Sequence, residues 1–290
     1  MLVLAHQTLA GRFEVATVDH GLRAAAADEA ALVAQLCARH GVAHRTIRLD
    51  LGSGAGVQHR ARDARYAALA AWLRERGLAA LVTAHHLDDQ AETLLMRLNR
   101  GAGVRGLAGM RPRATLPGDP ELPLLRPLLG WRRGELHAVV AAAGLVPSDD
   151  PSNRDNRFER TRIRAGLASA GWIDPAALAI AARHLAEADA ALDWAAEGEW
   201  GRVEWGQVGG GANTASYTPT APRAVRMRVL ARIVLELGAK PPRGRDLARW
   251  LDALEGGRVA TLAGVRGDGT SLRWCFTPAR PHRGAPSEPS

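Results

Sequence analysis

The first hundred residues alternate between strand-like and helix-like segments, and this alternation constrains the fold more than any other feature. Short apolar or alternating runs, typical of strands, occupy 14–19, 43–51 and 78–84. Between them, 28–40 and 58–76 carry apolar residues at helical spacing. A β-α-β-α-β-α order predicts an α/β domain with a parallel sheet, helices on its faces and ligands at the carboxyl ends of the strands.

Beyond about residue 172 the pattern changes to helices, predicted at 175–194, 221–237 and 246–254. Several tryptophans fall in this part and are expected to pack a second core: Trp194, Trp200, Trp205, Trp250 and Trp274. We therefore expect the α/β domain over 1–172 and a smaller, mainly helical domain over 173–280. Because residues 281–290 are rich in Pro, Gly and Ser, we expect them to form a disordered tail.

The charge balance favours a polyanionic partner. The chain has 38 basic and 30 acidic residues, a formal net charge of +8, which suits nucleic acid. Lys240 is the only lysine, however, and an arginine- and alanine-rich chain is also what a GC-rich genome produces. A run of about 18 apolar residues and a signal-peptide pattern are both absent. We therefore expect a cytoplasmic protein without a membrane segment. Cys37 and Cys275 are far apart and form no C-x-x-C motif, which disfavours a structural zinc, an iron–sulfur cluster or a dithiol redox pair.

Acidic residues cluster where the third predicted strand passes into a helix. Asp88 and Glu92 are four residues apart, and Asp89 and Glu92 are three apart, so the three carboxylates crowd the first helical turn. Three acids repel one another unless a positive charge lies among them, such as a divalent metal with ATP phosphates or an ammonium substrate. The alternative is helix capping, because acids favour a helix N-terminus and Asp89-x-x-Glu92 is a passable capping box.

Three further clusters suit a nucleotide or RNA. Asp19 ends the first predicted strand before a tight turn at Gly21, where its carboxylate can accept a hydrogen bond from a ribose or a base. Arg62 and Arg65 lie on one side of the second predicted helix and can pair with phosphates, or form an ordinary solvated face. An Asx/Pro turn leads into an arginine-dense segment that suits a phosphate backbone or, alternatively, a solvated helix: Arg154, Arg157, Arg160, Arg162 and Arg164.

Five motifs, in order along the chain, resemble the tRNA(Ile)-lysidine synthetase family of N-type ATP pyrophosphatases. They are VDHGLR at 18–23, ARDARY at 61–66, HHLDDQAETLLMRLNRGAGVRGLAGM at 85–110, LLRPLL at 124–129 and DDPSNRDNRFERTRIR at 149–164. The resemblance covers roughly residues 1–170 and implies a PP-loop, Rossmann-like nucleotide-binding domain with a second domain that binds tRNA. It also implies a two-step reaction on isoleucine tRNA with a CAU anticodon. ATP adenylates the C2 oxygen of the wobble cytidine, and the amine of free lysine then displaces AMP to form lysidine.

The resemblance also implies roles for individual residues. Asp88, Asp89 and Glu92 would hold Mg²⁺ and the lysine ammonium, with Asp88 and Asp89 as the metal ligands, and His86 is a candidate base. The residues implied at the ATP site are Asp19, His20, Arg23, Arg62, Arg65 and His85. Those implied at the tRNA are Arg105, Arg154, Arg157, Arg160, Arg162 and Arg164. A homodimer stays an open alternative to a monomer.

The sequence departs from the family at its beginning. The family carries a first strand and an SGG-x-D-S loop that cradles the ATP pyrophosphate, and no such motif occurs in the 290 residues. We therefore expect Met1 to be an internal methionine, the chain as given to be inactive, and a gap in the sheet to expose apolar strand edges. The alternatives are a non-catalytic RNA-binding remnant and another PP-loop tRNA-modifying enzyme, although a thiolase is disfavoured because paired cysteines are absent.

Overall fold

The computed structural model describes residues 1–9, 11–19, 25–50, 57–146, 157, 159–208, 211–238 and 240–279. The chain divides into two compact units, unit 1 over 1–186 and unit 2 over 187–290. The division falls inside helix α8 (Pro175–Trp200), whereas the sequence pattern places the domain boundary between 172 and 173. The predicted disordered tail lies outside the described residues.

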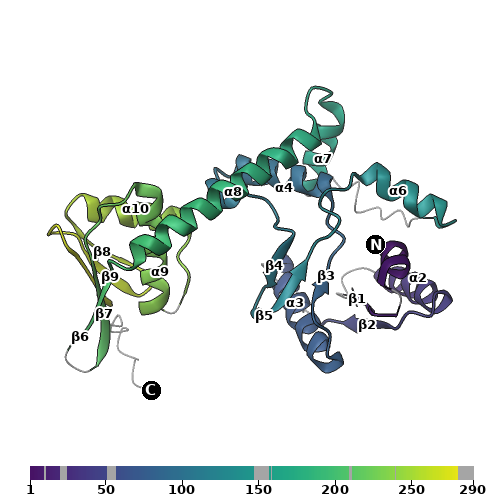
Figure 1. The fold of residues 1–290 in the computed structure, drawn as a ribbon, viewed down its shortest axis with the longest axis horizontal. Coiled ribbons are helices and arrows are strands. Elements are labelled where there is room, and N and C mark those ends of the chain that lie inside the picture. Colours follow the sequence, from purple (N-terminus) through teal and green to yellow (C-terminus); the bar gives the residue numbers. More distant parts are fainter. Residues whose placement is uncertain are drawn as a thin grey trace, which may run out of the picture. The chain divides into compact units, whose positions relative to one another are not determined.

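The strands of unit 1 form two separate sheets (Figure 1). β1 (Val15–Asp19) pairs in parallel with β2 (His44–Arg48). β3 (Leu81–Val82) pairs in parallel with β5 (Asp119–Leu125), which pairs antiparallel with β4 (Arg113–Leu116). The α/β class and the three predicted strands are confirmed, with shorter bounds than the sequence pattern indicated.

The helices of unit 1 are α1 (Leu2–Leu9), α2 (Ala25–Arg39), α3 (Val57–Arg76), α4 (Leu87–Asn99), α5 (Val104–Leu107), α6 (Arg133–Ala142) and α7 (Glu159–Ser169). Helices follow β1, β2 and β3 in turn along the chain; α2 packs against β1 and β2, and α3 packs against β5. Tyr66, Leu69 and Leu73 of α3 pack with Leu81 and Leu124 of the β3–β5–β4 sheet in a buried cluster. α4 lies beside α7 (Figure 1), which matters for the site below. In the part of the chain that is described, no helix combines the length and apolar character needed to cross a membrane.

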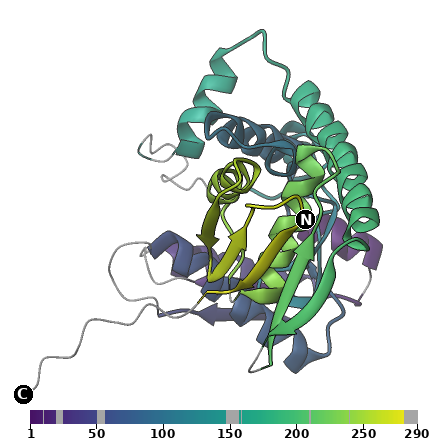
Figure 2. The same cartoon turned by 90° about the vertical axis from the view of Figure 1, so that its left-hand side faces the viewer.

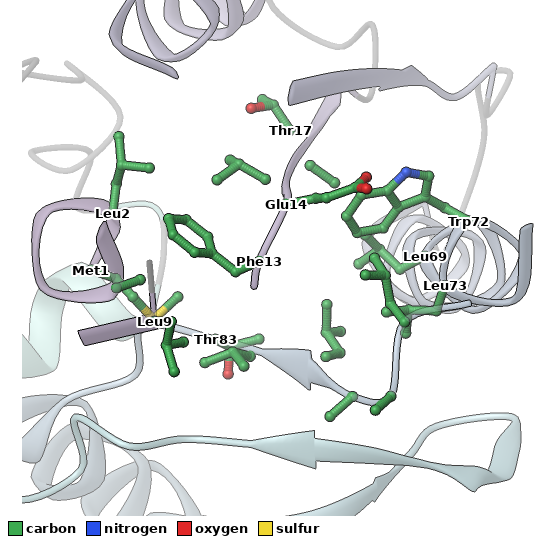
Figure 3. Close-up of a pocket in the computed structure, with 18 of the residues that line it drawn as sticks. Met1, Leu2, Leu9, Phe13, Glu14, Thr17, Leu69, Trp72, Leu73 and Thr83 are labelled. Carbon is green, nitrogen blue, oxygen red and sulfur yellow. The ribbon is translucent and has the colours of Figure 1, made fainter. Parts of the chain in front are cut away.

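A cavity of about 670 Å³ is lined by β1, β3 and the helices α1 and α3 (Figure 3). Among the described residues, β1 and β3 are not hydrogen-bonded to each other. Apolar side chains dominate the walls, and they include Leu2, Phe13, Leu69, Trp72 and Leu73. The expected gap in the sheet, bordered by apolar residues, is therefore present.

Unit 2 is built on a five-stranded antiparallel sheet with the order β6-β7-β10-β9-β8, drawn in green to yellow in Figure 2. Its elements are β6 (Glu204–Val208), β7 (Ala212–Tyr217), α9 (Arg223–Leu237), α10 (Gly244–Glu255), β8 (Val259–Leu262), β9 (Val265–Asp268) and β10 (Trp274–Pro278). The sequence pattern predicted the helices but missed the sheet, because strands of four to six residues show too few alternations.

The core of unit 2 lies between this sheet and the two helices. Ile233 of α9, Leu251 of α10 and Phe276 of β10 are fully buried in it. The expectation that all the tryptophans of this part pack the core is wrong for Trp194 on α8, which is 82% exposed, and for Trp205 on β6, which is 45% exposed. Trp250 and Trp274 are buried in the core, as expected.

Candidate active site

The three predicted carboxylates lie in the first turns of α4, just beyond β3. Asp89 Oδ2 accepts a hydrogen bond of 3.0 Å from the backbone N–H of His86, which immediately precedes the helix. A capping hydrogen bond is therefore present, and it is formed between Asp89 and His86. The capping box considered from the sequence would instead have paired Asp89 with Glu92. Asp88 and Glu92 are engaged elsewhere, so capping alone does not explain the cluster.

Glu92 is the most deeply buried of the three, with 2% of its surface exposed. Arg160 Nε donates to Glu92 Oε2 at 2.6 Å, and Arg164 Nε donates to Oε1 at 2.8 Å. Burial alone would raise the pKa of Glu92, but the hydrogen bonds from Arg164 and Arg160 outweigh it and lower the pKa below its usual value. Glu92 is therefore a buried, ionised carboxylate.

Asp88 and Asp89 also face positive groups. The backbone N–H of Arg133, in the first turn of α6, donates to Asp88 Oδ2 at 2.7 Å, and Arg132 Nη2 lies 3.4 Å from Oδ1. Arg160 Nη2 donates to Asp89 Oδ1 at 3.0 Å. The positive charge that the sequence requires among the three acids is thus supplied, in this structure, by the chain's own arginines and by the start of α6.

The two histidines before α4 are held in their neutral forms. Burial lowers the pKa of both His85 and His86, although Asp89 acts in the opposite direction on each. Thr83 Oγ1 lies 2.9 Å from His85 Nδ1, and His86 Nε2 lies 3.5 Å from Asp89 Oδ2. His86 Nδ1 is buried and has no hydrogen-bond partner among the described residues. A neutral imidazole beside carboxylates has the chemistry of a proton acceptor.

The donor set limits what kind of metal the site can hold. Among the described residues, no group of three or more His, Cys, Asp or Glu side chains is placed to bind a metal ion. Asp88 and Asp89 nevertheless offer the hard carboxylate oxygens that Mg²⁺ prefers, and Mg²⁺ commonly takes only one or two carboxylates together with phosphates and water. These two residues therefore fit an ion that arrives with a phosphate ligand.

The residues predicted at the ATP site come from three elements. Asp19 is buried at the end of β1, whereas Arg62 and Arg65 are exposed on α3. Burial lowers the pKa of His85, and the charges of Arg126, Arg160 and Arg62 lower it further. Two predicted residues, His20 and Arg23, lie outside the described part of the chain.

The arginines predicted to bind tRNA divide into two groups. Arg160 and Arg164 face the carboxylates of α4, as described above. Arg105 of α5, Arg157 and Arg162 are exposed, and Arg162 Nη1 donates to the carbonyl of Arg157 at 3.1 Å. Arg154 lies outside the described residues. Helix α7 therefore presents basic groups both to the acidic cluster and to solvent.

Sequence reasoning missed Arg132 and Arg133 as partners of Asp88. Sequence reasoning had a signal for them, because a helix N-terminus attracts a carboxylate, and Arg132 immediately precedes α6 while Arg133 begins it. It also missed Gln90, whose side chain bonds Met110 in both directions: Nε2 donates to the carbonyl at 2.8 Å, and Oε1 accepts from the N–H at 2.7 Å. This clamp, the pair of hydrogen bonds between Gln90 and Met110, holds the glycine-rich segment after α4 in place. No local sequence pattern predicts it.

Comparisons with known proteins cover the same region. Residues 1–170 match a family model described as a PP-loop domain. The chain is 57% identical over 285 residues to the tRNA(Ile)-lysidine synthase of Novosphingobium aromaticivorans, covering 97% of this chain and 86% of that one. It is 38% identical over 280 residues to the tRNA(Ile)-lysidine synthase of Zymomonas mobilis, covering 94% and 82%. A solved U34-tRNA thiolase, NcsA from Methanococcus maripaludis with its 4Fe-4S cluster, aligns at 18% identity with a TM-score of 0.47, covering 60% and 62%.

Proposed function

The chain belongs to the tRNA(Ile)-lysidine synthase family of PP-loop proteins, and from this premise we propose how its residues serve an ATP-dependent tRNA-modifying ligase. The substrates we propose are ATP, free lysine and isoleucine tRNA with a CAU anticodon. We place the reaction in the cytoplasm, where these substrates occur together. The observation that carries the proposal is the buried, ionised Glu92 beside Asp88 and Asp89 at the end of β3.

The reaction balances in two steps. In the first, the C2 oxygen of the wobble cytidine attacks the α-phosphorus of ATP, the bond to the β-phosphate breaks, and pyrophosphate leaves. In the second, the lysine amine attacks C2, the C2–O bond breaks, AMP leaves with the bonding electrons, and the new nitrogen loses a proton. The first step makes a poor leaving oxygen into a good one, and the second forms the carbon–nitrogen bond.

Glu92 and Asp89 are the groups proposed to bind the lysine ammonium. Each already accepts hydrogen bonds from a cationic group, Glu92 from Arg160 and Arg164 and Asp89 from Arg160. An ammonium that takes the place of one guanidinium keeps the carboxylates paired, so the exchange avoids the cost of a bare buried charge. The neutral imidazole of His86 is proposed to accept the proton that the nucleophilic amine must lose.

The other predicted residues are proposed to serve the metal ion, the nucleotide and the tRNA. Asp88 and Asp89 would hold Mg²⁺, which when bound offsets the charge that builds on the triphosphate. The residues proposed at ATP are Asp19, His20, Arg23, Arg62, Arg65 and His85. The exposed Arg105, Arg157 and Arg162, together with Arg154, are proposed to contact the tRNA backbone, whereas Arg160 and Arg164 are proposed to do so only when they leave the carboxylates.

The test measures the two chemical steps separately. The protein is incubated with ATP, Mg²⁺, labelled lysine and a CAU isoleucine tRNA transcript, and pyrophosphate release and labelled tRNA are quantified beside a known lysidine synthase. Because the SGG-x-D-S motif does not occur in the 290 residues, the assay is run with this chain and with a version that includes any residues encoded upstream in frame. We expect label in tRNA from whichever form releases pyrophosphate, and none with a transcript whose wobble base is guanosine.

A pair of variants connects the chemistry to the site. Asp89→Asn should lower lysine incorporation on the order of 100-fold, because a charge aimed at the reacting groups is lost. Glu121→Gln, at an exposed position on β5, is the matched control and should leave both steps unchanged. Salt-sensitive tRNA binding without pyrophosphate release from either form would instead favour the non-catalytic RNA-binding alternative.

A further inference from the structure

Three arginines of unit 1 lie on neighbouring elements and have no carboxylate partner among the described residues. Arg62 is on α3, Arg97 is in the last turn of α4, and Arg126 directly follows β5. Helix α3 packs against β5, where Tyr66 and Leu124 share a buried cluster, and Arg62 Cζ lies 5.3 Å from the centroid of the Tyr66 ring. The arginines around Glu92, by contrast, are paired with acidic side chains. Arg62, Arg97 and Arg126 therefore form a group with an excess of positive charge.

One loop brings two of these arginines together. Arg97 Nη1 donates to the carbonyl of Gly106 at 2.7 Å and to that of Gly109 at 3.2 Å. Arg126 Nη1 donates to the carbonyl of Arg111 at 2.8 Å. Both guanidiniums are therefore anchored to carbonyls of the short stretch 106–111, which runs from the end of α5 toward β4.

The loop itself is held in place before any ligand binds. The buried amide of Gln90 forms two hydrogen bonds with the backbone of Met110, and Gly109 has a positive φ of 66° that keeps the chain turning at this point. A fixed loop means that the guanidiniums need no reorganisation to bind, which preserves affinity.

Arg126 is the most deeply buried of the three arginines. Its side chain is 8% exposed, and its Nε has no hydrogen-bond partner among the described residues. Burial lowers its pKa, and the charges of Arg62 and Arg97 lower it further, against an opposing effect of Tyr66. Burial and Arg62 likewise lower the pKa of Arg97. Unpaired buried charges of one sign are costly, and an anion between them would remove that cost.

We propose that Arg62, Arg97 and Arg126 form a phosphate-binding site separate from the carboxylate cluster at Glu92. Phosphate is the fitting class because guanidinium forks bind its oxygens in pairs and several arginines match its multiple negative charge. The site adjoins the carboxylate cluster, since Arg97 and Glu92 lie on the same helix, α4. The inference rests on the proposed function in one respect, because ATP and tRNA are taken as the two sources of the phosphate.

The experiment measures binding and requires no turnover. Calorimetry gives the affinity of the protein for pyrophosphate and for ATP, and fluorescence anisotropy gives its affinity for a labelled anticodon stem-loop RNA at several salt concentrations. The variants are Arg126→Gln and Arg62→Gln, and the matched control is Arg113→Gln, an exposed arginine on the neighbouring strand β4. We expect both variants to bind at least one probe about tenfold more weakly, which corresponds to about 1.4 kcal/mol, with the control unchanged.

Comparison of the results for pyrophosphate, ATP and RNA identifies the source of the phosphate. A loss confined to ATP and pyrophosphate assigns the site to the nucleotide, whereas a loss confined to RNA, with a salt slope smaller by about 1, assigns it to the tRNA backbone. Wild-type affinity for all probes in Arg62→Gln and Arg126→Gln would overturn the proposal and leave the arginines as clamps of the loop.

The test gives a clear result even if the Arg126 variant does not fold or the proposed function is wrong. Arg126 is buried, so its variant can fail to fold, and the exposed Arg62→Gln then decides alone: unchanged binding overturns the site. The outcome is also distinguishable from failure of the proposed function. Loss of phosphate binding in the variants of a protein that never forms lysidine would reject the ligase assignment and keep the site.

Discussion

Arg164 of α7 donates from Nε to Oε1 of Glu92 in α4 across 2.8 Å, although the two residues are 72 positions apart in the chain. Arg160 reinforces this contact from one helical turn earlier, at 2.6 Å from Oε2. The acidic cluster of α4 is therefore neutralised by the same segment that its arginine density marks as a tRNA surface. Under the proposed function, binding of a substrate ammonium to the carboxylates would therefore release α7 arginines toward RNA.

The first prediction concerns the stability that Glu92 contributes. Glu92→Gln leaves Arg160, Arg164 and Arg133 without their central negative charge, and losing one partner of a buried ion pair is costly. We expect a loss of about 2 kcal/mol in the free energy of unfolding. The loss is smaller than for an ion pair fully shielded from water, because the arginines are partly exposed. Urea unfolding followed by circular dichroism measures it. Glu121→Gln is the control, and equal stability of both variants would contradict the prediction.

The second prediction is the pH dependence of that contribution. The pKa of Glu92 is lowered in the folded protein from its ordinary value of 4.5. The unfolded chain therefore takes up a proton first as the pH falls, and the stabilisation is complete above pH 4.5 and disappears as the pH drops through the folded pKa. The stability difference between wild type and Glu92→Gln should accordingly be constant from pH 7 to about pH 5 and shrink at lower pH. A difference that grows toward low pH would show that the carboxylate is not stabilised in its ionised form.

Local sequence patterns were sufficient to predict those features that neighbouring residues determine. The strands at 15–19 and 44–48 follow from short apolar or alternating runs, and the placement of Asp88, Asp89 and Glu92 on one helical turn follows from their spacing. The partners of these acids could not be found in this way, because an arginine 68 or 72 positions away shares no local pattern with Glu92.

The hairpin β4–β5 shows a second limit of sequence reasoning. This hairpin was not among the predicted strands, and its prolines disfavour a strand, since proline cannot donate to a strand ladder. Pro120 and Pro123 are tolerated because the short strand β3 pairs only with Leu124 and Leu125 on that edge of β5. Knowledge of the partner strand, which the sequence does not supply, was needed to recover this strand.

The third prediction tests the clamp between Gln90 and Met110. A Cβ on Gly109 would lie 2.8 Å from Gln90 Oε1 and 3.3 Å from the Cβ of Ala182, and the backbone there has a φ of 66°. Gly109→Ala should therefore lower the melting temperature by several degrees, through backbone strain of about 1 kcal/mol together with displacement of Gln90. Gly118→Ala is the matched control, because Gly118 also has a positive φ but nothing lies within 4 Å of an added Cβ. Equal shifts in both variants would leave only the backbone strain.

The fourth prediction separates the two groups of arginines on α7. Arg162 is exposed, so Arg162→Gln should weaken tRNA binding several-fold and reduce the slope of log affinity against log salt by about 1. Arg164→Gln should change that slope less, because its charge is already paired with Glu92, and should instead destabilise the fold. Filter binding between 50 and about 200 mM KCl measures both slopes. A larger slope change for Arg164→Gln would mean that RNA draws this arginine away from Glu92.

The fifth prediction concerns a buried hydrogen bond in unit 2. Tyr217, which is 1% exposed, donates from its hydroxyl to Glu199 Oε1 at 2.8 Å, and burial together with this carboxylate raises the pKa of the phenol. Tyr217→Phe removes the donor and leaves Glu199 with only the longer contacts to Thr220 and Arg202, so we expect a loss of about 2 kcal/mol.

Tryptophan fluorescence can report this loss, since the ring of Trp274 lies 6.5 Å from that of Tyr217. The double variant Glu199→Gln with Tyr217→Phe closes a mutant cycle, and a coupling energy of about 1 kcal/mol is expected for two groups in direct contact. If the two substitutions were instead additive, the cost of Tyr217→Phe would come from packing around the ring, and the hydrogen bond to Glu199 would contribute nothing to the stability of this unit.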